Sequence, residues 1–313
     1  MNEENLTNTS GIITEDPAVN MPIGSNLHFN PALITHEFEY QAVWLKDWDS
    51  FQGVLLSIHF RIKETHSIEG SAVLVAPGIA LSAKHVFTDS LDDIMNGKKS
   101  TISTAITKDG LQIWRINKIT LIDNSDLVIL GLTYCSQLPS GNLFNMVTIT
   151  TRFPKIGENL LITGFRASDY SFDIKDNDKG DKVMNCSGNV LACNGIVSNR
   201  FPTGRDKVML PWPTLEVDCP SFGGMSGGPV FDSNGLLIGL LSSSFDDGPS
   251  YVSLLWQSLA TEFEGGWPNS IFKNKSTLID LSPTLCAIDR SSAISVTLNK
   301  DKTKSINYEA WEE

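Results

Sequence analysis

From residue 51 onward, the chain consists of short apolar runs that alternate with turn-forming residues. The runs are rich in Val, Ile and Leu, and Gly, Asn, Asp or Pro stands between them, as in SAVLVAPG, SDLVILGL and LLIGLLSSS. Runs of this length between turn signals are typical of β-strands, and many in succession indicate a sandwich or barrel. Helix signals are few: one follows His85 in VFTDSLDDIMNG, and another lies in SLLWQSLATEFEGG. The pattern predicts an all-β fold.

Three segments do not follow this pattern. Residues 1 to about 48 are rich in Asn, Glu, Thr and Pro, and we expect an extension that becomes ordered late, with its aromatic residues packed against the body of the protein. Residues 167–188 are polar and charged, which predicts a long surface loop. Residues 263–313 form a tail with one strand-like stretch, SAISVTLN. All three segments are candidates for docking a partner or occluding a site.

The composition limits the possible partners and compartment. With 313 residues, 41% of them hydrophobic, the chain is long enough for one large domain or two small ones. The net charge of −12 argues against nucleic-acid or anionic-membrane partners, which require clustered Lys and Arg. The first residues lack a secretory pattern, no apolar run reaches about 18 residues, and the five cysteines form no CxxC pair. We therefore expect a cytoplasmic protein with reduced thiols.

One short stretch, FGGMSGGPVF, places Ser226 among four glycines. Glycine is costly in ordered structure, and it recurs where the chain turns at positive φ or where another group approaches the backbone closely. A serine in such a turn is either incidental or held out to react. A reactive hydroxyl needs a base to accept its proton and donors to stabilise the oxyanion.

Among five histidines, His85 is the best candidate for that base. It follows the predicted hairpin SAVLVAPG and IALSAKHVF, where a rigid strand ends and a loop begins. Asp126, which opens the run SDLVILGL, is the best candidate for the carboxylate that orients it, and Asp123 is the competing choice. His59 and His66 have no Cys or carboxylate companions at metal-ligand spacing, so we predict no metal and no cofactor.

The blocks LSAKHVF, NSDLVIL and GGMSGGPVFDSNGLLIGLLS resemble, in order and spacing, the catalytic blocks of the trypsin-like (chymotrypsin-fold) serine peptidases, most closely the bacterial, disulfide-free members. The resemblance covers residues 50–262 and implies two six-stranded antiparallel β-barrels, about 50–150 and 151–262, between extensions 1–49 and 263–313. It implies that His85, Asp126 and Ser226 form a catalytic triad. It also implies an oxyanion hole formed by the amides of Gly224 and Ser226.

The resemblance also locates the pocket for the substrate side chain before the scissile bond. Its floor is implied at Pro220 and Ser221, and its walls at Ser242, Ser243, Ser244 and Ser250. No carboxylate stands at the floor, so we predict a preference for an uncharged residue. Asp246 or Asp247 at the mouth is the rival possibility, which would favour Lys or Arg.

The sequence departs from the digestive and clotting members at Met225, where those proteins carry an aspartate that binds the N-terminus freed by cleavage. We therefore predict that no N-terminal cleavage is needed. The expected function is a regulated intracellular serine endopeptidase with a protein or peptide substrate and a possible regulatory protein partner. The alternatives are a catalytically silent peptide-binding module and a cysteine-based hydrolase of another β fold, although Cys219 is better explained as a small buried residue.

Overall fold

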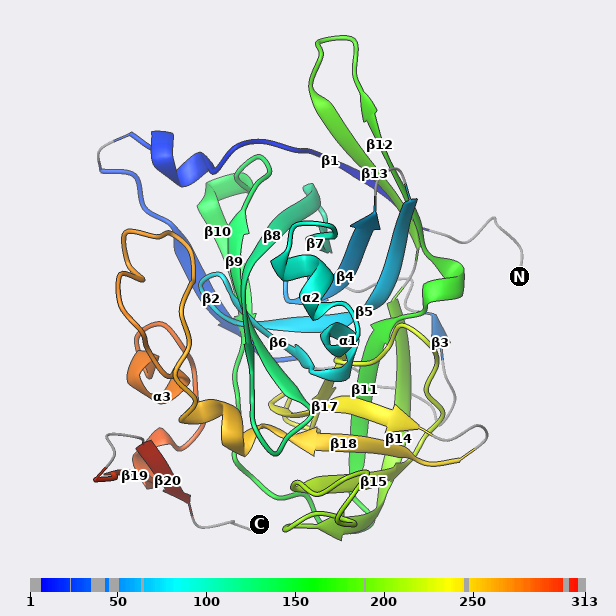
Figure 1. The fold of residues 1–313 in the computed structure, drawn as a ribbon, viewed down its shortest axis with the longest axis vertical. Coiled ribbons are helices and arrows are strands. Elements are labelled where there is room, and N and C mark those ends of the chain that lie inside the picture. Colours follow the sequence, from blue (N-terminus) through cyan, green and yellow to red (C-terminus); the bar gives the residue numbers. More distant parts are fainter. Residues whose placement is uncertain are drawn as a thin grey trace.

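The computed structural model describes residues 7–22, 24–34, 43–44, 51–62, 65–188, 190–244, 248–300 and 304–308, and it confirms the all-β prediction (Figure 1). Two closed six-stranded antiparallel barrels form the body of the protein. The strands of the first barrel, in ring order, are β4 (Leu55–Ile62), β5 (Thr65–Ala76), β6 (Ile79–Ala83), β9 (Leu127–Tyr134), β8 (Gly110–Leu121) and β7 (Ser100–Thr107). The predicted helical segment after His85 is two short helices, α1 (His85–Thr88) and α2 (Leu91–Met95).

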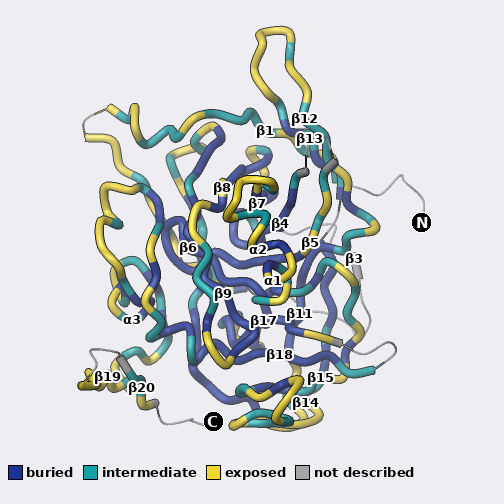
Figure 2. Tube along the Cα trace, viewed as in Figure 1, coloured by how far each residue is buried: buried dark blue, intermediate teal, exposed yellow. Residues whose placement is uncertain are grey.

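The second barrel closes in the same way. Its strands, in ring order, are β11 (Asn159–Phe165), β16 (Pro229–Phe231), β17 (Leu237–Ser244), β18 (Ser250–Leu254), β15 (Thr214–Asp218) and β14 (Val190–Phe201). The long strand β14 closes the ring because its first half pairs with β11 and its second half with β15. The strands carry the buried residues, whereas exposed residues gather on the loops and on the projecting hairpin (Figure 2). The helix predicted near residues 253–264 is instead the end of β18 followed by a 3-10 turn, η6 (Leu255–Leu259).

The prediction of a long loop at residues 167–188 is wrong. After a 3-10 turn, η5 (Ala167–Asp169), the chain forms a hairpin of β12 (Ser171–Asp176) and β13 (Lys182–Gly188) that projects from the body. The hairpin continues as a sheet because β1 (Thr7–Ile12), from the other end of the sequence, pairs with β13. Local polarity suggested a loop, but β12 and β13 satisfy their backbone groups by pairing with each other, and β13 also pairs with the distant β1.

The described part of the N-terminal extension is built into the fold rather than merely appended to it. After β1 and a 3-10 turn, η2 (Pro17–Asn20), the strand β2 (His28–Ala32) pairs in parallel with β10 (Leu143–Val147), which follows a 3-10 turn, η4 (Ser140–Asn142). The short strand β3 (Val43–Trp44) extends the second barrel next to β14. In addition, β1 packs on β8 of the first barrel, where Gly11 lies against Leu111. The extension therefore contacts both barrels, against the expectation that it is only a late-ordering segment. The side chains of Phe38, Tyr40, Trp44 and Trp48 lie outside the described residues.

The C-terminal segment returns to the first barrel. Trp267 is fully buried and packs edge to face on Trp114, with ring centroids 5.8 Å apart. Its indole N–H donates to the carboxylate of Asp16 over 2.7 Å, which ties the two extensions together. Further on lie α3 (Leu278–Leu281), a 3-10 turn, η7 (Ser291–Ala293), and the hairpin of β19 (Ile294–Leu298) and β20 (Lys304–Tyr308); β19 confirms the predicted strand.

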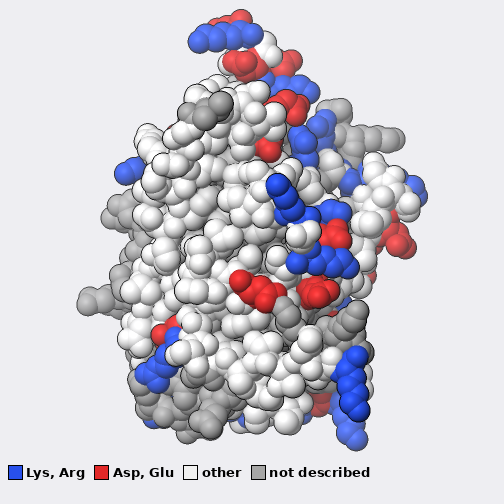
Figure 3. Space-filling model, turned by 90° about the vertical axis from the view of Figure 1, so that its left-hand side faces the viewer, with Lys and Arg blue, Asp and Glu red and all other residues white. Residues whose placement is uncertain are grey.

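The face of the molecule shown in Figure 3 is largely uncharged. On it, charged side chains of both signs lie on the projecting β12–β13 hairpin at the top and along the right-hand edge. Among the helices of the described ranges, none has the length and apolar character needed to cross a bilayer.

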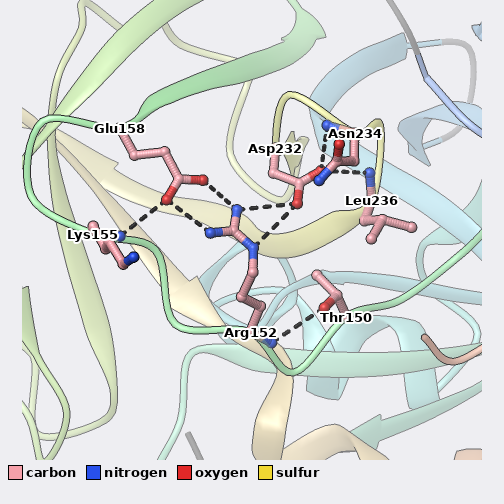
Figure 4. A network of polar contacts seen from close by, with 7 residues as sticks. All are labelled: Thr150, Arg152, Lys155, Glu158, Asp232, Asn234 and Leu236. Carbon is pink, nitrogen blue, oxygen red and sulfur yellow. Dashed lines mark hydrogen bonds and ion pairs between the residues drawn. The ribbon is translucent and has the colours of Figure 1, made fainter. Parts of the chain in front are cut away.

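A buried ion network holds the second barrel together directly after the nucleophile segment. The Arg152 guanidinium donates to the carboxylates of Asp232 (3.0 Å) and Glu158, and Asp232 also accepts the backbone N–H groups of Asn234 and Leu236 (Figure 4). The Asp232 side chain is 0% exposed and that of Arg152 is 9% exposed. Burial alone would raise the pKa of Glu158, but the hydrogen bonds and charge of Arg152 hold it below its ordinary value. The network therefore joins the turn between β16 and β17, which contains Asp232, to the segment before β11, which contains Arg152.

This network predicts the effect of removing its cation. The substitution Arg152→Ala leaves the Asp232 carboxylate buried and unpaired, so we expect a loss of about 3 to 5 kcal/mol in the free energy of unfolding. Urea denaturation measures it. The matched control is Lys155→Ala: Lys155 is exposed, its hydrogen bond to Glu158 comes from the backbone N–H, which Ala keeps, and only its exposed charge is lost, so we expect a loss below about 0.5 kcal/mol. Equal losses in the two variants would contradict the role given to Arg152.

Candidate active site

The register of two neighbouring strands brings His85 and Asp126 together. In the first barrel β6 pairs with β9 so that Ala83 faces Leu127. His85 begins the helix that follows β6, and Asp126 directly precedes β9, so both residues lie at the same end of the strand pair. The Lys84 N–H donates to the Asp126 carbonyl over 3.0 Å and continues the pairing by one step.

The buried Asp126 carboxylate is surrounded by donors. Its Oδ1 accepts the His85 backbone N–H (2.9 Å), and its Oδ2 lies 2.8 Å from His85 Nδ1. An ionised carboxylate only accepts hydrogen bonds, so Nδ1 carries the proton and Nε2 is left as the basic nitrogen. Burial lowers the pKa of His85, but the hydrogen bond and the charge of Asp126 raise it more, so the pKa of His85 lies above its ordinary 6.5.

The hydroxyl of Ser242 also donates to Asp126 Oδ2, a contact that the sequence analysis did not predict. Ser242 is buried, and its assignment to a pocket wall stays a prediction. The strand assignment was correct, since Ser242 lies in β17. The face of the strand to which a side chain points depends on register, and β17 carries a register shift between Leu241 and Ser243.

The glycines around Ser226 are explained by backbone geometry. Gly224 has φ +95° and Gly227 has φ +80°, the left-handed region that glycine occupies without strain. A Cβ on Gly227 would also lie 2.3 Å from the Ser71 carbonyl oxygen, and one on Gly228 would lie 2.0 Å from the carbonyl oxygen of Thr163. The loop is therefore pressed against the first barrel on one side and against β11 on the other.

Four consecutive carbonyl groups of this loop each accept a hydrogen bond. The Gly223 carbonyl accepts from the Ala167 N–H (2.9 Å), and the Gly224 carbonyl accepts from the Ser71 hydroxyl (2.8 Å). The Met225 carbonyl accepts from the Gly228 N–H (2.8 Å), and the Ser226 carbonyl from the Ser71 N–H (2.8 Å).

The amides of the same loop are arranged in the opposite way. In a trans peptide the carbonyl and the following N–H point in opposite directions. The N–H groups of Gly224 and Ser226 are thus turned away from the anchored carbonyls of Gly223 and Met225, and neither donates to another group of the described residues. Two amide donors two residues apart are the arrangement that an oxyanion needs.

Ser226 lies on the second barrel, opposite His85. Gly70 of β5 lies close to both segments: a Cβ built on it would lie 2.8 Å from Val86 Cγ2 and 2.9 Å from the Ser226 carbonyl oxygen. The residue after His85 and the serine loop therefore pack on the same glycine. Among the hydrogen bonds of the described chain, none joins Ser226 Oγ to the imidazole, a contact that is often long before a substrate binds.

The other predicted pocket residues lie around the segment before the nucleophile. Pro220 is exposed, Ser221 half-buried and Ser243 exposed, and the side chain of Ser244 lies outside the described residues. Ser250 is fully buried at the start of β18, and its hydroxyl donates to the Cys219 carbonyl over 2.7 Å. Asp246 and Asp247 lie outside the described residues.

The remaining candidates have surroundings that do not suit a catalytic role. Asp123 is exposed, and Cys219 is buried, where its contact with the Cys193 thiol and burial itself raise its pKa. His59 is buried on Ser57 (2.7 Å), and burial lowers its pKa to about 3. Within the described ranges, no group of three or more His, Cys, Asp or Glu side chains could hold a metal ion. The sequence analysis missed Ser71, because a serine within a strand carries no signal of contact with residue 224.

Comparison with known proteins gives one family match and several similar solved structures. The family model for the trypsin-like peptidase domain matches residues 70–240. Solved structures that match include the Rv3671c protease of M. tuberculosis (15% identity, 66% of this chain and 85% of that one, TM-score 0.43). Another is Deg5, with 18% identity over 65% of this chain and 84% of that one and a TM-score of 0.45. A third is the MamO protease domain of Magnetospirillum magneticum, with 12% identity over 66% of this chain and 95% of that one and a TM-score of 0.45. No curated protein matches the sequence.

The His85–Asp126 contact predicts how the imidazole titrates. We expect an NMR titration of His85 with a midpoint above 6.5, because the carboxylate stabilises the imidazolium. The substitution Asp126→Asn removes that charge and leaves the effect of burial, so the midpoint should fall. Asp123→Asn, at an exposed carboxylate, is the control and should leave it unchanged. A midpoint that responds to Asp123 and not to Asp126 would show that the wrong carboxylate has been assigned.

Proposed function

We propose that this chain, which belongs to the trypsin-like peptidase family, is a serine endopeptidase that cleaves protein or peptide substrates. The observation that carries the proposal is the His85–Asp126 hydrogen bond at the edge of the first barrel, facing a serine loop whose carbonyl groups are all anchored. A base with a fixed tautomer and a rigid pair of amide donors are the two aids that a serine nucleophile requires.

The proposed mechanism assigns one step to each group. Ser226 Oγ attacks the scissile carbonyl carbon while His85 Nε2 accepts its proton. The resulting imidazolium is stabilised by Asp126, which already accepts the Nδ1 proton. The N–H groups of Gly224 and Ser226 bind the oxyanion of the tetrahedral intermediate. His85 then gives the proton to the leaving amine, which departs and leaves the acyl-enzyme. In the second half of the reaction, water attacks the acyl carbonyl while His85 accepts a proton from it, and His85 returns that proton to Ser226 as the acid product leaves.

The Ser242 hydroxyl adds a positioning element to this mechanism. It lies on β17 of the second barrel and donates to a carboxylate of the first, so the orientation of Asp126 depends on both barrels. Both oxygens of the buried Asp126 carboxylate accept hydrogen bonds, which lowers the free-energy cost of keeping the carboxylate ionised away from water.

Regulation and partners are part of the proposal. An intracellular peptidase must be restrained, and the β12–β13 hairpin with β1 is an exposed sheet, joined to the site through η5, on which a regulatory protein could act. The net charge of −12 supports a protein partner over a nucleic acid or an anionic membrane.

Labelling with a fluorophosphonate tests the reaction class, because the probe reacts with an activated serine. We expect the wild type to be labelled and to hydrolyse peptides, and we expect Ser226→Ala and His85→Ala to lose about 10³-fold or more of the activity. Asp126→Asn should lose a comparable factor, whereas Asp123→Asn should retain the wild-type rate. A folded wild type that neither labels nor cleaves would favour the catalytically silent peptide-binding module.

The pocket residues give a prediction about specificity. Pro220, Ser221 and Ser250 bring no charge to the segment before the nucleophile, and burying an unpaired cation costs several kcal/mol. A peptide-library digest should therefore show cleavage after uncharged residues, either apolar or small and polar. Cleavage almost wholly after Lys or Arg that is lost in Asp246→Asn or Asp247→Asn would overturn this prediction.

A further inference from the structure

Ser71 of β5 uses every one of its polar groups. Its N–H donates to the Ser226 carbonyl (2.8 Å), and its own carbonyl accepts from the Ser82 hydroxyl (2.7 Å). Its hydroxyl donates to the Gly224 carbonyl (2.8 Å) and accepts the Phe165 N–H (3.0 Å). The residue is fully buried between the two barrels. Three of its four hydrogen bonds therefore cross from the first barrel to the second.

We propose that the Ser71 hydroxyl is a positioning group for the oxyanion hole, fixing the Gly224–Met225 peptide so that the amides of Gly224 and Ser226 converge. This inference rests on the proposed function of the site. The hydroxyl touches no reacting atom, so it acts through the loop.

The need for such a group follows from the backbone of the loop. Gly224, at φ +95°, is flanked by two peptides that can rotate at little cost, since glycine permits most dihedral combinations. The peptide before it is held by the Ala167 N–H and the peptide after it by the Ser71 hydroxyl. The N–H of this second peptide, that of Met225, also donates to the Phe222 carbonyl over 3.0 Å. Without the Ser71 hydroxyl the Gly224–Met225 peptide keeps that one bond alone, so its carbonyl is left without a partner and the peptide is less firmly oriented.

The loop has no polar side chain at position 225 that could do this. Met225 is fully buried in the apolar core of the second barrel, and its Cα packs on Gly164. Its thioether holds the loop by shape alone and cannot orient a peptide dipole. The Ser71 hydroxyl reaches the carbonyl next to Met225 and simultaneously accepts a β11 amide, so one group aligns the loop with both its neighbours.

The first test is kinetic. The substitution Ser71→Ala should lower kcat by roughly 10- to 100-fold with KM nearly unchanged, less than the 10² to 10³ that removal of an oxyanion donor costs. Affinity for a peptide aldehyde, which forms a tetrahedral adduct, should fall by the same factor, while that for the corresponding peptide alcohol should not. Ser71→Thr keeps the hydroxyl and should recover most of the rate.

The matched control is Ser258→Ala. Ser258 is also fully buried, and its hydroxyl donates to a carbonyl, that of Leu255 (2.6 Å), away from the site. Its removal should lower thermal stability to a similar degree and leave kcat and aldehyde affinity unchanged. Equal kinetic losses in Ser71→Ala and Ser258→Ala, or an unchanged kcat in Ser71→Ala, would overturn the proposal.

The second test does not depend on activity. ¹⁵N relaxation dispersion of the Gly224 and Ser226 amides should be flat in the wild type and should show exchange in Ser71→Ala. A flat profile in both proteins would contradict the positioning role even if peptide hydrolysis is confirmed. If the wild type neither labels nor cleaves, the proposed function fails, but the dispersion data still decide the role of Ser71. If Ser71→Ala does not fold, exchange at these amides in the wild type is the contradicting result.

Discussion

The hydrogen bonds that Ser71 and Ser242 make across the interface join the two barrels at the point where the chemistry is proposed. Ser71 carries the nucleophile loop of the second barrel on a strand of the first, and Ser242 of the second barrel binds the Asp126 carboxylate of the first. Buried hydrogen bonds of this kind are costly to break, because a lost partner leaves a desolvated polar group. The site is therefore shared: neither barrel alone holds the imidazole, the carboxylate and the serine loop in one arrangement.

The extensions strengthen the same arrangement from outside. Trp267 packs on Trp114 of the first barrel and donates a hydrogen bond to Asp16, so the N-terminal and C-terminal extensions are joined. The N–H of Ile34 donates to the Gly235 carbonyl in the β16–β17 turn, the same turn that Asp232 and Arg152 hold from the other side. That turn lies only a few residues beyond Ser226 in the chain. Packing at a distance from the site thus limits how far the nucleophile segment can move.

The sequence predicted most strands of both barrels, because a buried apolar strand ends at residues that turn the chain. It did not predict β7, which is rich in Ser and Thr, and it assigned the end of β18 to a helix. It also singled out His85, Asp126 and Ser226, since a histidine, a carboxylate and a glycine-framed serine at strand ends are chemically conspicuous. It failed at residues 167–188, which form β12 and β13 although they are polar. β12 and β13 pair with each other, and β13 also pairs with β1. The second pairing joins segments about 170 residues apart and leaves no mark in local composition.

What the sequence by itself determined is the β-rich fold and the identity of the reactive groups, because both depend on residue type and on spacing along one segment. What only the tertiary structure decided is which groups meet. The Ser242 hydroxyl donates to Asp126, and the Ser71 hydroxyl donates to the Gly224 carbonyl. Strand register and closure of the barrels set these contacts, and a shift of one residue would point each side chain to the opposite face. Both depend on the free energy of the whole packed core rather than on any local run of residues.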